Sequence, residues 1–157
     1  MKSVLSAALL LLAAPALAQP AADSRLTRLL DDNGLAYEVD EAGDLRLNMG
    51  LQAGRTQKAS IESQPYAVAG AEFREIWSVG WVSDQPPQWE TVMRMLEDSH
   101  DSPAGGWTMH AGEQQFVLVY KVKLPADASY KHLLAALYAA SFAADRLELA
   151  MSGKDEF

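Results

Sequence analysis

Cysteine is absent from the 157 residues of this chain. Without thiols the protein has no disulfide framework, no cysteine nucleophile, no zinc–thiolate site and no iron–sulfur cluster. Positive charge is also scarce, because 13 Lys and Arg residues stand against 21 Asp and Glu, for a formal net charge of -8. This excess of negative charge argues against nonspecific binding to nucleic acid or to anionic lipid.

The rest of the composition is that of an ordinary folded domain. Hydrophobic residues make up 49% of the chain and charged residues 22%, a balance typical of globular rather than disordered proteins. The length suits one domain, since domains usually run to roughly 100–150 residues. We therefore expect a single acidic, globular domain.

The longest apolar run lies at the N-terminus and has the organisation of a secretory signal peptide. Lys2 gives it a positive start, residues 4–14 are rich in Leu and Ala, and residues 16–18 form the small-residue cleavage site Ala-Leu-Ala. The run is well short of the roughly 20 apolar residues that a membrane-spanning helix needs. We therefore expect residues 1–18 to be a signal peptide, cleaved after Ala18.

The predicted cleavage implies a location for the mature chain. Residues 19–157 contain no second apolar stretch of spanning length, so we expect no membrane insertion after the signal peptide is removed. An exported chain without cysteine fits a bacterial periplasm or the extracellular space. Residues 19–22 are interpreted as a short leader before the folded domain.

Three segments have the 3.6-residue period of amphipathic helices. In the first, Asp23 or Ser24 can cap a helix that ends at Asn33-Gly34. The second follows a Pro-Pro pair, and the third is Ala-rich and follows a cap at Asp127 or Ser129. The apolar faces expected to meet the core are Leu26, Leu29 and Leu30; Trp89, Val92, Met93 and Leu96; and Leu133, Leu134, Leu137, Tyr138, Ser141 and Phe142.

Other segments alternate with the period of 2 that is typical of strands. The expected strands cover residues 35–39, 45–49, 57–63 (the weakest pattern), 73–83, a strand starting at residues 106–109, and 116–124, with a loop at 65–71. In the fourth, Phe73, Trp77, Val79 and Trp81 share the face that we expect in the core. In the last, Phe116, Leu118, Tyr120, Val122 and Leu124 all point one way.

The order of these elements predicts the fold class. Strands come in hairpin-like groups instead of alternating with helices, which favours an antiparallel sheet and an α+β fold. We expect five to six strands and three helices in the order α-β-β-β-(β)-α-β-β-α, with the domain over residues 23–150. Residues 151–157 are expected to form a flexible tail.

Several segments together resemble the YbjN-type domain family, whose fold is similar to that of type III secretion chaperones. The resemblance rests on Leu29–Val39, on Asp44–Leu47, and on Gly105-Gly106-Trp107 followed by Phe116–Tyr120 ahead of the Ala-rich helix. It departs at Trp89–Val92, where the family often has an Asn-rich helix start. The resemblance implies a domain, often dimeric, that binds or regulates other proteins and is not a catalyst.

The densest polar cluster does not match a known catalytic or metal motif. Glu97 and residues 98–101 (Asp-Ser-His-Asp) offer ligands for a divalent cation, but they lack the EF-hand order and a second histidine at helical spacing. His100, His110 and His132 are the only histidines, and no Gly-x-Ser-x-Gly, phosphate-binding Gly-rich loop or His-Glu-x-x-His is present. We expect no enzyme, no metal site and no cofactor.

Four residues are the candidates for contact with a partner. Aromatic anchors dominate many recognition surfaces. Trp89 begins the helix after the Pro-Pro pair and Trp107 follows two glycines, so that either could lie at the rim of a binding surface. Val117 and Val119 lie on the other face of the last strand, opposite its main apolar face. If the helices cover only one face of the sheet, these valines are left for a homodimer or a client protein, unless an N-terminal segment packs over them.

The sequence thus leaves three functions open. The first is an exported, non-catalytic YbjN-like domain that binds another protein as a chaperone, adaptor or regulator in the cell envelope. The second is a binder of a small apolar ligand or lipid, in a cavity between the sheet and the last helix lined by Trp77, Phe116 and Tyr138. The weakest is a metal-dependent or hydrolytic enzyme with a cleft around His100 or His110.

Overall fold

The structure, a computed structural model, describes residues 21–112 and 114–157. The predicted signal peptide lies outside these residues. The elements in chain order are α1 (Ser24–Asp31), β1 (Glu38–Val39), β2 (Leu45–Gly50), η1 (Gln52–Gly54), β3 (Thr56–Ile61), β4 (Tyr66–Val68), β5 (Ala71–Ser83), α2 (Trp89–Asp101), β6 (Gly106–Ala111), β7 (Phe116–Pro125) and α3 (Tyr130–Ser152). None of the described helices is both long enough and apolar enough to cross a membrane.

The strands form one antiparallel sheet, which confirms the predicted α+β class. The sheet has 7 strands in the order β1-β2-β3-β5-β7-β6, with β4 paired to β5 beside this path. The additional strand, β4, lies in the segment that we expected to be a loop. β1 is shorter than expected, because only Glu38 and Val39 pair with β2.

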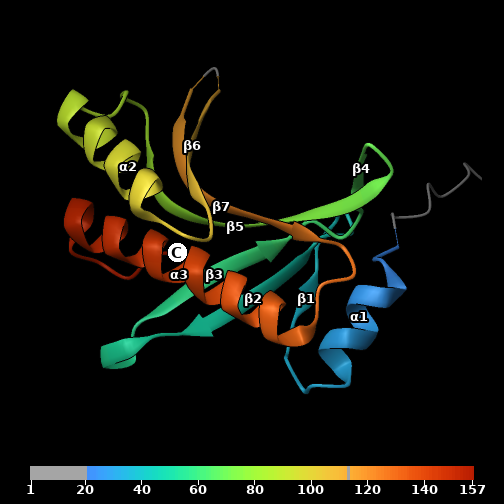
Figure 1. The fold of residues 1–157 in the computed structure, drawn as a ribbon. Helices are drawn as coiled ribbons and strands as arrows, with labels where there is room; N and C mark the ends of the chain where they lie inside the picture. The colour runs from blue at the N-terminus through green and yellow to red at the C-terminus, as the bar shows by residue number, and fades with distance from the viewer. Residues whose placement is uncertain (1–20, 113) are drawn as a thin grey trace, which may run out of the picture.

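All three helices pack on the same face of the sheet. α3 lies across β2, β3, β5 and β7, and α1 and α2 cover the two ends of that face (Figure 1). Leu118, Tyr120, Val122 and Leu124 of β7 are buried on this side, as their common spacing predicts. The main core therefore lies between the sheet and α1 and α3, and a smaller one lies beneath α2.

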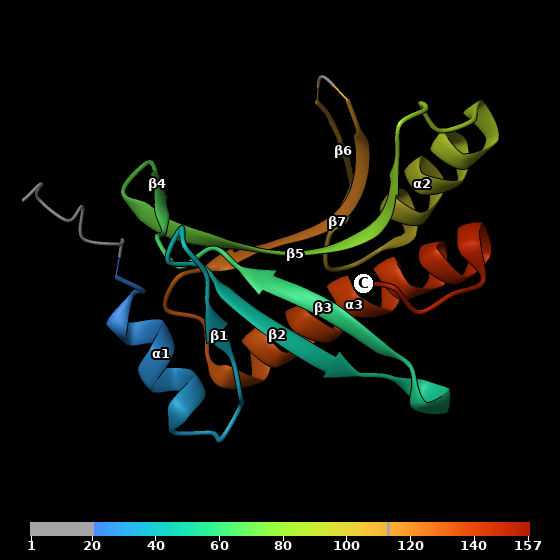
Figure 2. The same cartoon turned by 180° about the vertical axis from the view of Figure 1, so that it is seen from behind.

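None of the helices in residues 21–112 and 114–157 lies on the opposite face of the sheet (Figure 2). The sheet bends away from α3, so that the β6–β7 hairpin and β4 stand up at the two ends of this open face (Figure 2). The open face is consequently concave.

The face of β5 that packs in the core is the opposite of the one that we predicted. Arg74, Ile76 and Ser78 are buried on the helix side, whereas Trp77 and Val79 are half-buried on the open face. Our prediction for Phe73, Trp77 and Val79 was therefore wrong. Aromatic bulk alone cannot choose between the two faces of a strand, because the other face of β5 also carries Ile76 and residues small enough to lie beneath α3.

A bulge at Gly80 changes the orientation of the end of β5. Val79 lies opposite Val119 and Trp81 lies opposite Leu118, so that Gly80 has no partner on β7. An extra residue in one strand redirects the side chains that follow it. Trp81 therefore points to the helix side and packs in the core beneath α2, which confirms its predicted core position.

α2 also differs from the predicted orientation. Met95 is its one buried residue, whereas Trp89, Met93 and Leu96 of the expected core stripe are exposed at 69%, 36% and 57%. The helix is turned so that Met95 meets Leu118 of the sheet. The exposed stripe is an apolar strip on the outside of the molecule.

A buried arginine connects the start of α1 to the sheet. Asp23 caps the helix by accepting a hydrogen bond from the Arg25 backbone N–H at 2.9 Å. Arg74, which is only 2% exposed, donates to Asp23 Oδ2 at 3.1 Å and to the backbone oxygens of Ser63 at 2.7 Å and Glu62 at 3.1 Å. One guanidinium thus holds the helix cap and the turn after β3 together.

The Asp23 carboxylate predicts an acid-sensitive contribution to stability. Hydrogen bonds from Arg25, assisted by Arg74 and opposed by burial, lower the pKa of Asp23 from 3.8 to about 2. A lowered pKa gives stability that is complete above the unfolded value and is lost as the pH falls from about 4 to about 2. Over this pH range we expect the free energy of unfolding of wild type to fall by about 1–2 kcal/mol more than that of Asp23→Asn, as measured by chemical denaturation. The difference is no larger because solvent screens the exposed Arg25. Parallel pH profiles of the two proteins would contradict this role.

The C-terminal residues are held against α3, although their sequence suggests a flexible tail. α3 ends at Ser152, and Gly153 follows in the left-handed conformation at φ 70°. The buried carboxylate of Glu148 accepts hydrogen bonds from the backbone N–H groups of Glu156 at 2.5 Å and Phe157 at 3.2 Å. A buried carboxylate requires donors, and the last residues supply them.

Candidate functional site

The open face of the sheet carries a row of apolar side chains. Val79 and Val119 lie directly opposite each other on β5 and β7, and Val82 lies opposite Val117 beyond the bulge. Trp77 continues the row towards β3. Val119 is 4% exposed, because its neighbours on the sheet surround it, whereas Val117 and Trp77 are half-buried and accessible.

Two hollows share the centre of this row. One has a volume of about 620 Å³ and the other about 390 Å³, and Trp77 and Val79 belong to the walls of both. The first is also lined by Ala36, Tyr37, Glu38, Arg46, Asn48, Lys58, Ser60 and Phe157, and the second by Asp44, Glu62, His110, Val117, Val119 and Lys121. We call the two hollows together the open-face groove.

Charged groups of both signs border the open-face groove. The guanidinium of Arg46 lies 4.7 Å from the centre of the Trp77 ring and pairs with Asp40 at 2.7 Å. Glu75 forms an ion pair with Lys121 at the floor. Burial, together with the nearby charge of Glu75, raises the pKa of Glu62. The groove is therefore an apolar strip between charges of both signs.

The structure does not bring the four predicted partner residues together. Val117 and Val119 lie in the open-face groove. Trp89 is exposed at the start of α2, and Trp107 lies between β6 and the helices, both on the helix side of the sheet. The predicted surface therefore divides into the open-face groove and the outer face of α2.

Trp107 is held firmly inside the fold. Its indole Nε1 donates to Asp98 Oδ2 at 2.8 Å, and its ring meets Tyr120 edge-on with the centroids 5.3 Å apart. A Cβ at Gly80 would lie 2.8 Å from the ring, so the indole covers the bulge directly. The two contacts give Trp107 a structural role that the sequence did not reveal.

The predicted polar cluster at the end of α2 is used for packing. Asp98 accepts from Trp107 with one carboxylate oxygen and from Arg146 at 2.7 Å with the other. Its carboxylate thereby joins α2 to β6 and α3. His100 is exposed at the end of the helix, apart from the open-face groove.

The other two histidines are also separate from any catalytic arrangement in the described residues. His110 lines the open-face groove, while His132 lies on α3 with Nδ1 3.1 Å from the Ser129 hydroxyl. No described carboxylate forms an ion pair with either imidazole. The geometry that a Ser-His-Asp triad requires is therefore not assembled around them.

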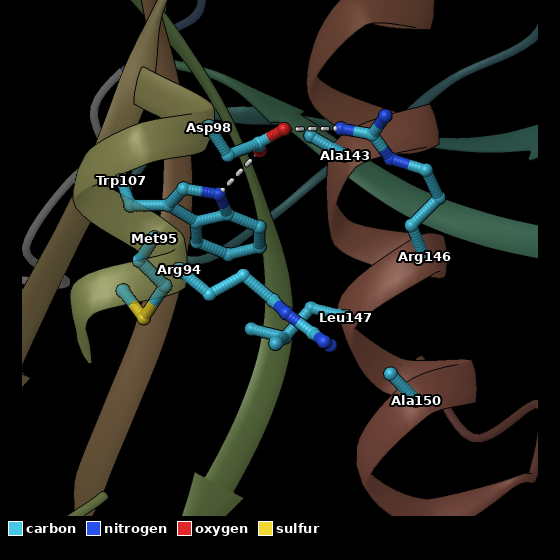
Figure 3. Close-up of a pocket in the computed structure, with 8 residues that line it drawn as sticks. All are labelled: Arg94, Met95, Asp98, Trp107, Ala143, Arg146, Leu147 and Ala150. Carbon is cyan, nitrogen blue, oxygen red and sulfur yellow. Dashed lines mark hydrogen bonds and ion pairs between the residues drawn. The ribbon is translucent and has the colours of Figure 1, made fainter. Parts of the chain in front are cut away.

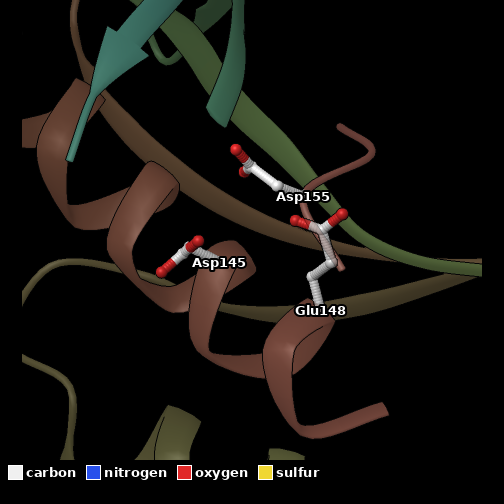
Figure 4. Close-up of side chains that lie close together, drawn as sticks. All are labelled: Asp145, Glu148 and Asp155. Atoms are coloured by element: carbon white, nitrogen blue, oxygen red, sulfur yellow. The ribbon is translucent and has the colours of Figure 1, made fainter. Parts of the chain in front are cut away.

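Three carboxylates at the end of α3 form the one group in the described residues with the spacing of a metal site. Oxygen atoms of Asp145, Glu148 and Asp155 lie within 4.8 Å of one another (Figure 4). The guanidinium of Arg55 is already among them, at 2.5 Å from Asp145, 3.4 Å from Glu148 and 3.8 Å from Asp155. Arg55 supplies the positive charge, and the cluster ties the turn after β2 to the end of α3.

The predicted ligand cavity between the sheet and α3 is not formed by the expected residues. Trp77 lies on the open face, whereas Tyr138 lies on α3 on the other side of the sheet, 37% exposed and stacked on Phe142. The three residues Trp77, Phe116 and Tyr138 therefore cannot enclose one ligand. The buried residues of the main core between the sheet and α3 are mostly aliphatic.

The comparisons with known proteins concern the fold. No family model and no curated protein matches the chain. Among solved structures, it is similar to the crystal structure of YbjN from E. coli, a proposed transcription regulator. The two share 15% sequence identity, the match covers 82% of this chain and 89% of the other, and the TM-score is 0.47.

Proposed function

We propose that this protein is exported to the cell envelope, where it binds another protein through the open-face groove and has no catalytic activity. The observation that carries the proposal is the position of the helices, which all cover one face of the sheet and leave the row of Trp77, Val79 and Val117 accessible on the other. A contiguous apolar surface on a folded domain commonly marks an interaction site.

The chemistry of the groove favours a protein segment as the partner. Its apolar strip can receive side chains such as Leu or Phe, and its rim offers cations at Arg46 and Lys58 and an anion at Glu62. Mixed charges of this kind provide orientation and specificity more than raw affinity. The wide, concave shape suits a helix or an extended segment lying across β5 and β7.

Photo-crosslinking tests the groove directly. A benzoylphenylalanine at position 117 should form a stoichiometric adduct with one envelope protein, whereas the same group at Val68 should not. Val68 is a matched control, because it is 54% exposed on β4 and outside the groove. With the purified partner, Val117→Asp should weaken binding by about tenfold or more, and Val68→Asp by less than about twofold.

Several outcomes would overturn this proposal. Equal crosslinking from positions 117 and 68, or unchanged affinity in Val117→Asp with its melting temperature preserved, would exclude the groove as the site. A crosslink between two copies of this chain, together with a dimer in light scattering, would show that the groove forms a homodimer and does not bind a different protein. Intact mass of the crosslinked chain tests export, since cleavage after Ala18 leaves residues 19–157.

A further inference from the structure

A separate hollow lies on the other side of the sheet, in the crevice between α2 and α3. It has a volume of about 270 Å³, somewhat below the range of roughly 300–1,000 Å³ that is usual for small-molecule sites. α2 supplies one wall, α3 the other, and the Trp107 ring lies between them (Figure 3). We call it the α2–α3 crevice.

The interior of the α2–α3 crevice is apolar. Met95, Trp107 and Leu147 form its inner surface, and Ala143 and Ala150 leave room along α3 where larger side chains would close it. The indole N–H of Trp107 is already bonded to Asp98, so that the ring offers only apolar surface. An apolar chain or ring is therefore the part of a ligand that this interior suits.

Two arginines stand at the opening of the crevice. Arg146 pairs with Asp98, but the guanidinium of Arg94 has no hydrogen bond or ion pair with any other side chain in residues 21–112 and 114–157. Figure 3 shows it extending from α2 across the crevice toward Leu147. Asp98 and Arg146 neutralise each other, so the exposed guanidinium of Arg94 leaves the lining of the crevice with a net positive charge, which favours an anionic group on the ligand.

The space continues beyond Arg94. A further hollow of about 200 Å³ is lined by Glu90, Thr91 and Met151 and shares Arg94 and Leu147 with the crevice. Arg94 and Leu147 thus border both hollows. A ligand with one charged end and a short apolar chain can place its chain on Leu147 and its charge on Arg94.

We propose that the α2–α3 crevice binds a small anionic amphiphile, with a carboxylate or phosphate at Arg94 and a short apolar chain over Trp107 and Leu147. This site is separate from the open-face groove and does not depend on the proposed protein partner. A charge-assisted hydrogen bond to such a headgroup is worth roughly ten- to hundred-fold in affinity.

Octanoate, octyl phosphate and octyltrimethylammonium are suitable probes for the whole chain. Titration followed by the NMR signal of the Trp107 indole N–H, with calorimetry for affinity, should show saturable binding of an anionic probe and none of the cationic one. The preferred anion identifies the headgroup as carboxylate or phosphate. Arg94→Gln should weaken binding by about tenfold or more, while the control Arg28→Gln, exposed on α1, should leave it unchanged.

A second pair of variants tests the apolar part without changing charge. Ala150→Leu fills the crevice and should abolish binding, whereas Ala135→Leu, also exposed on α3 but outside the crevice, should not. The proposal is wrong if no anionic probe shifts the Trp107 signal, if the cationic probe binds equally well, or if Ala150→Leu binds like wild type.

Discussion

Gly105→Ala is expected to lower the free energy of unfolding by about 2–4 kcal/mol. A Cβ at this position would lie 2.2 Å from the backbone oxygen of Lys121 and 2.9 Å from Val122 Cγ2. The first of these contacts is with backbone inside the sheet, so it cannot be relieved by a side-chain rotation. Urea denaturation of the variant and wild type measures the difference.

Gly50→Ala is the matched control for this prediction. Gly50 ends β2, and a Cβ there meets no atom within 4 Å. We expect its unfolding free energy to stay within about 0.5 kcal/mol of wild type, as for most surface substitutions. If Gly105→Ala lowered the free energy of unfolding no more than Gly50→Ala does, the prediction would be wrong. The backbone at Gly105 could then move away from β7 at no cost in stability.

Arg74→Met is expected to destabilise the protein by about 3–5 kcal/mol, because it removes one partner of a buried ion pair. The substitution removes the buried donor of the Ser63 backbone oxygen and leaves the Asp23 carboxylate with the donors of Arg25 alone. The methionine occupies similar space, so the loss reports the polar contacts more than a cavity. Thermal and urea denaturation both measure it.

A double-variant cycle separates the ion pair from other effects of Arg74. In the Asp23→Asn background, Arg74→Met should cost less, because the charged carboxylate that it would leave with Arg25 as its one cationic partner is already neutral. Arg25→Met, which affects the same carboxylate from an exposed position, should be much milder than Arg74→Met. Additive losses in the double variant would contradict coupling between Arg74 and Asp23.

The periodicity of the sequence predicts the elements better than it predicts their orientation. The helices and most strands occur where a 3.6- or 2-residue period places them, because each period is a local property of the backbone. β4 escaped detection because three residues, Tyr66–Val68, are too few to show an alternation. Its pairing with β5 depends on the turn at Gly70, which has φ 85°.

Orientation is set by contacts that the local pattern does not contain. On β5 the side chains of Ile76 and Ser78 fit beneath α3, and the larger Trp77 is left on the open face. The packing of Met95 against Leu118 of β7 sets the rotation of α2 about its own axis. Both choices depend on elements far away in the sequence, so hydrophobicity along one segment cannot predict them.

The candidate site was predictable only in part, for the same reason. Val117 and Val119 follow from strand alternation, because residues between the core positions of β7 must lie on its other face. The contribution of Arg46 and Phe157 to the groove depends on the sheet order and on the path of the last residues. The sequence made Trp107 a candidate surface anchor, because it does not show the hydrogen bond from the Trp107 indole to Asp98. That bond joins β6 to α2 across a turn.

The unequal division of the core has a consequence for how the molecule opens. The part beneath α2 is held by Met95, Leu118 and Leu147 with Trp81 and Trp107, whereas α1 and α3 share a much larger cluster with the sheet. Regions with few buried apolar contacts unfold locally at a lower free-energy cost than the whole protein. We therefore expect α2 to detach as a unit while the rest stays folded, so that its amide hydrogens exchange with solvent before those of α3.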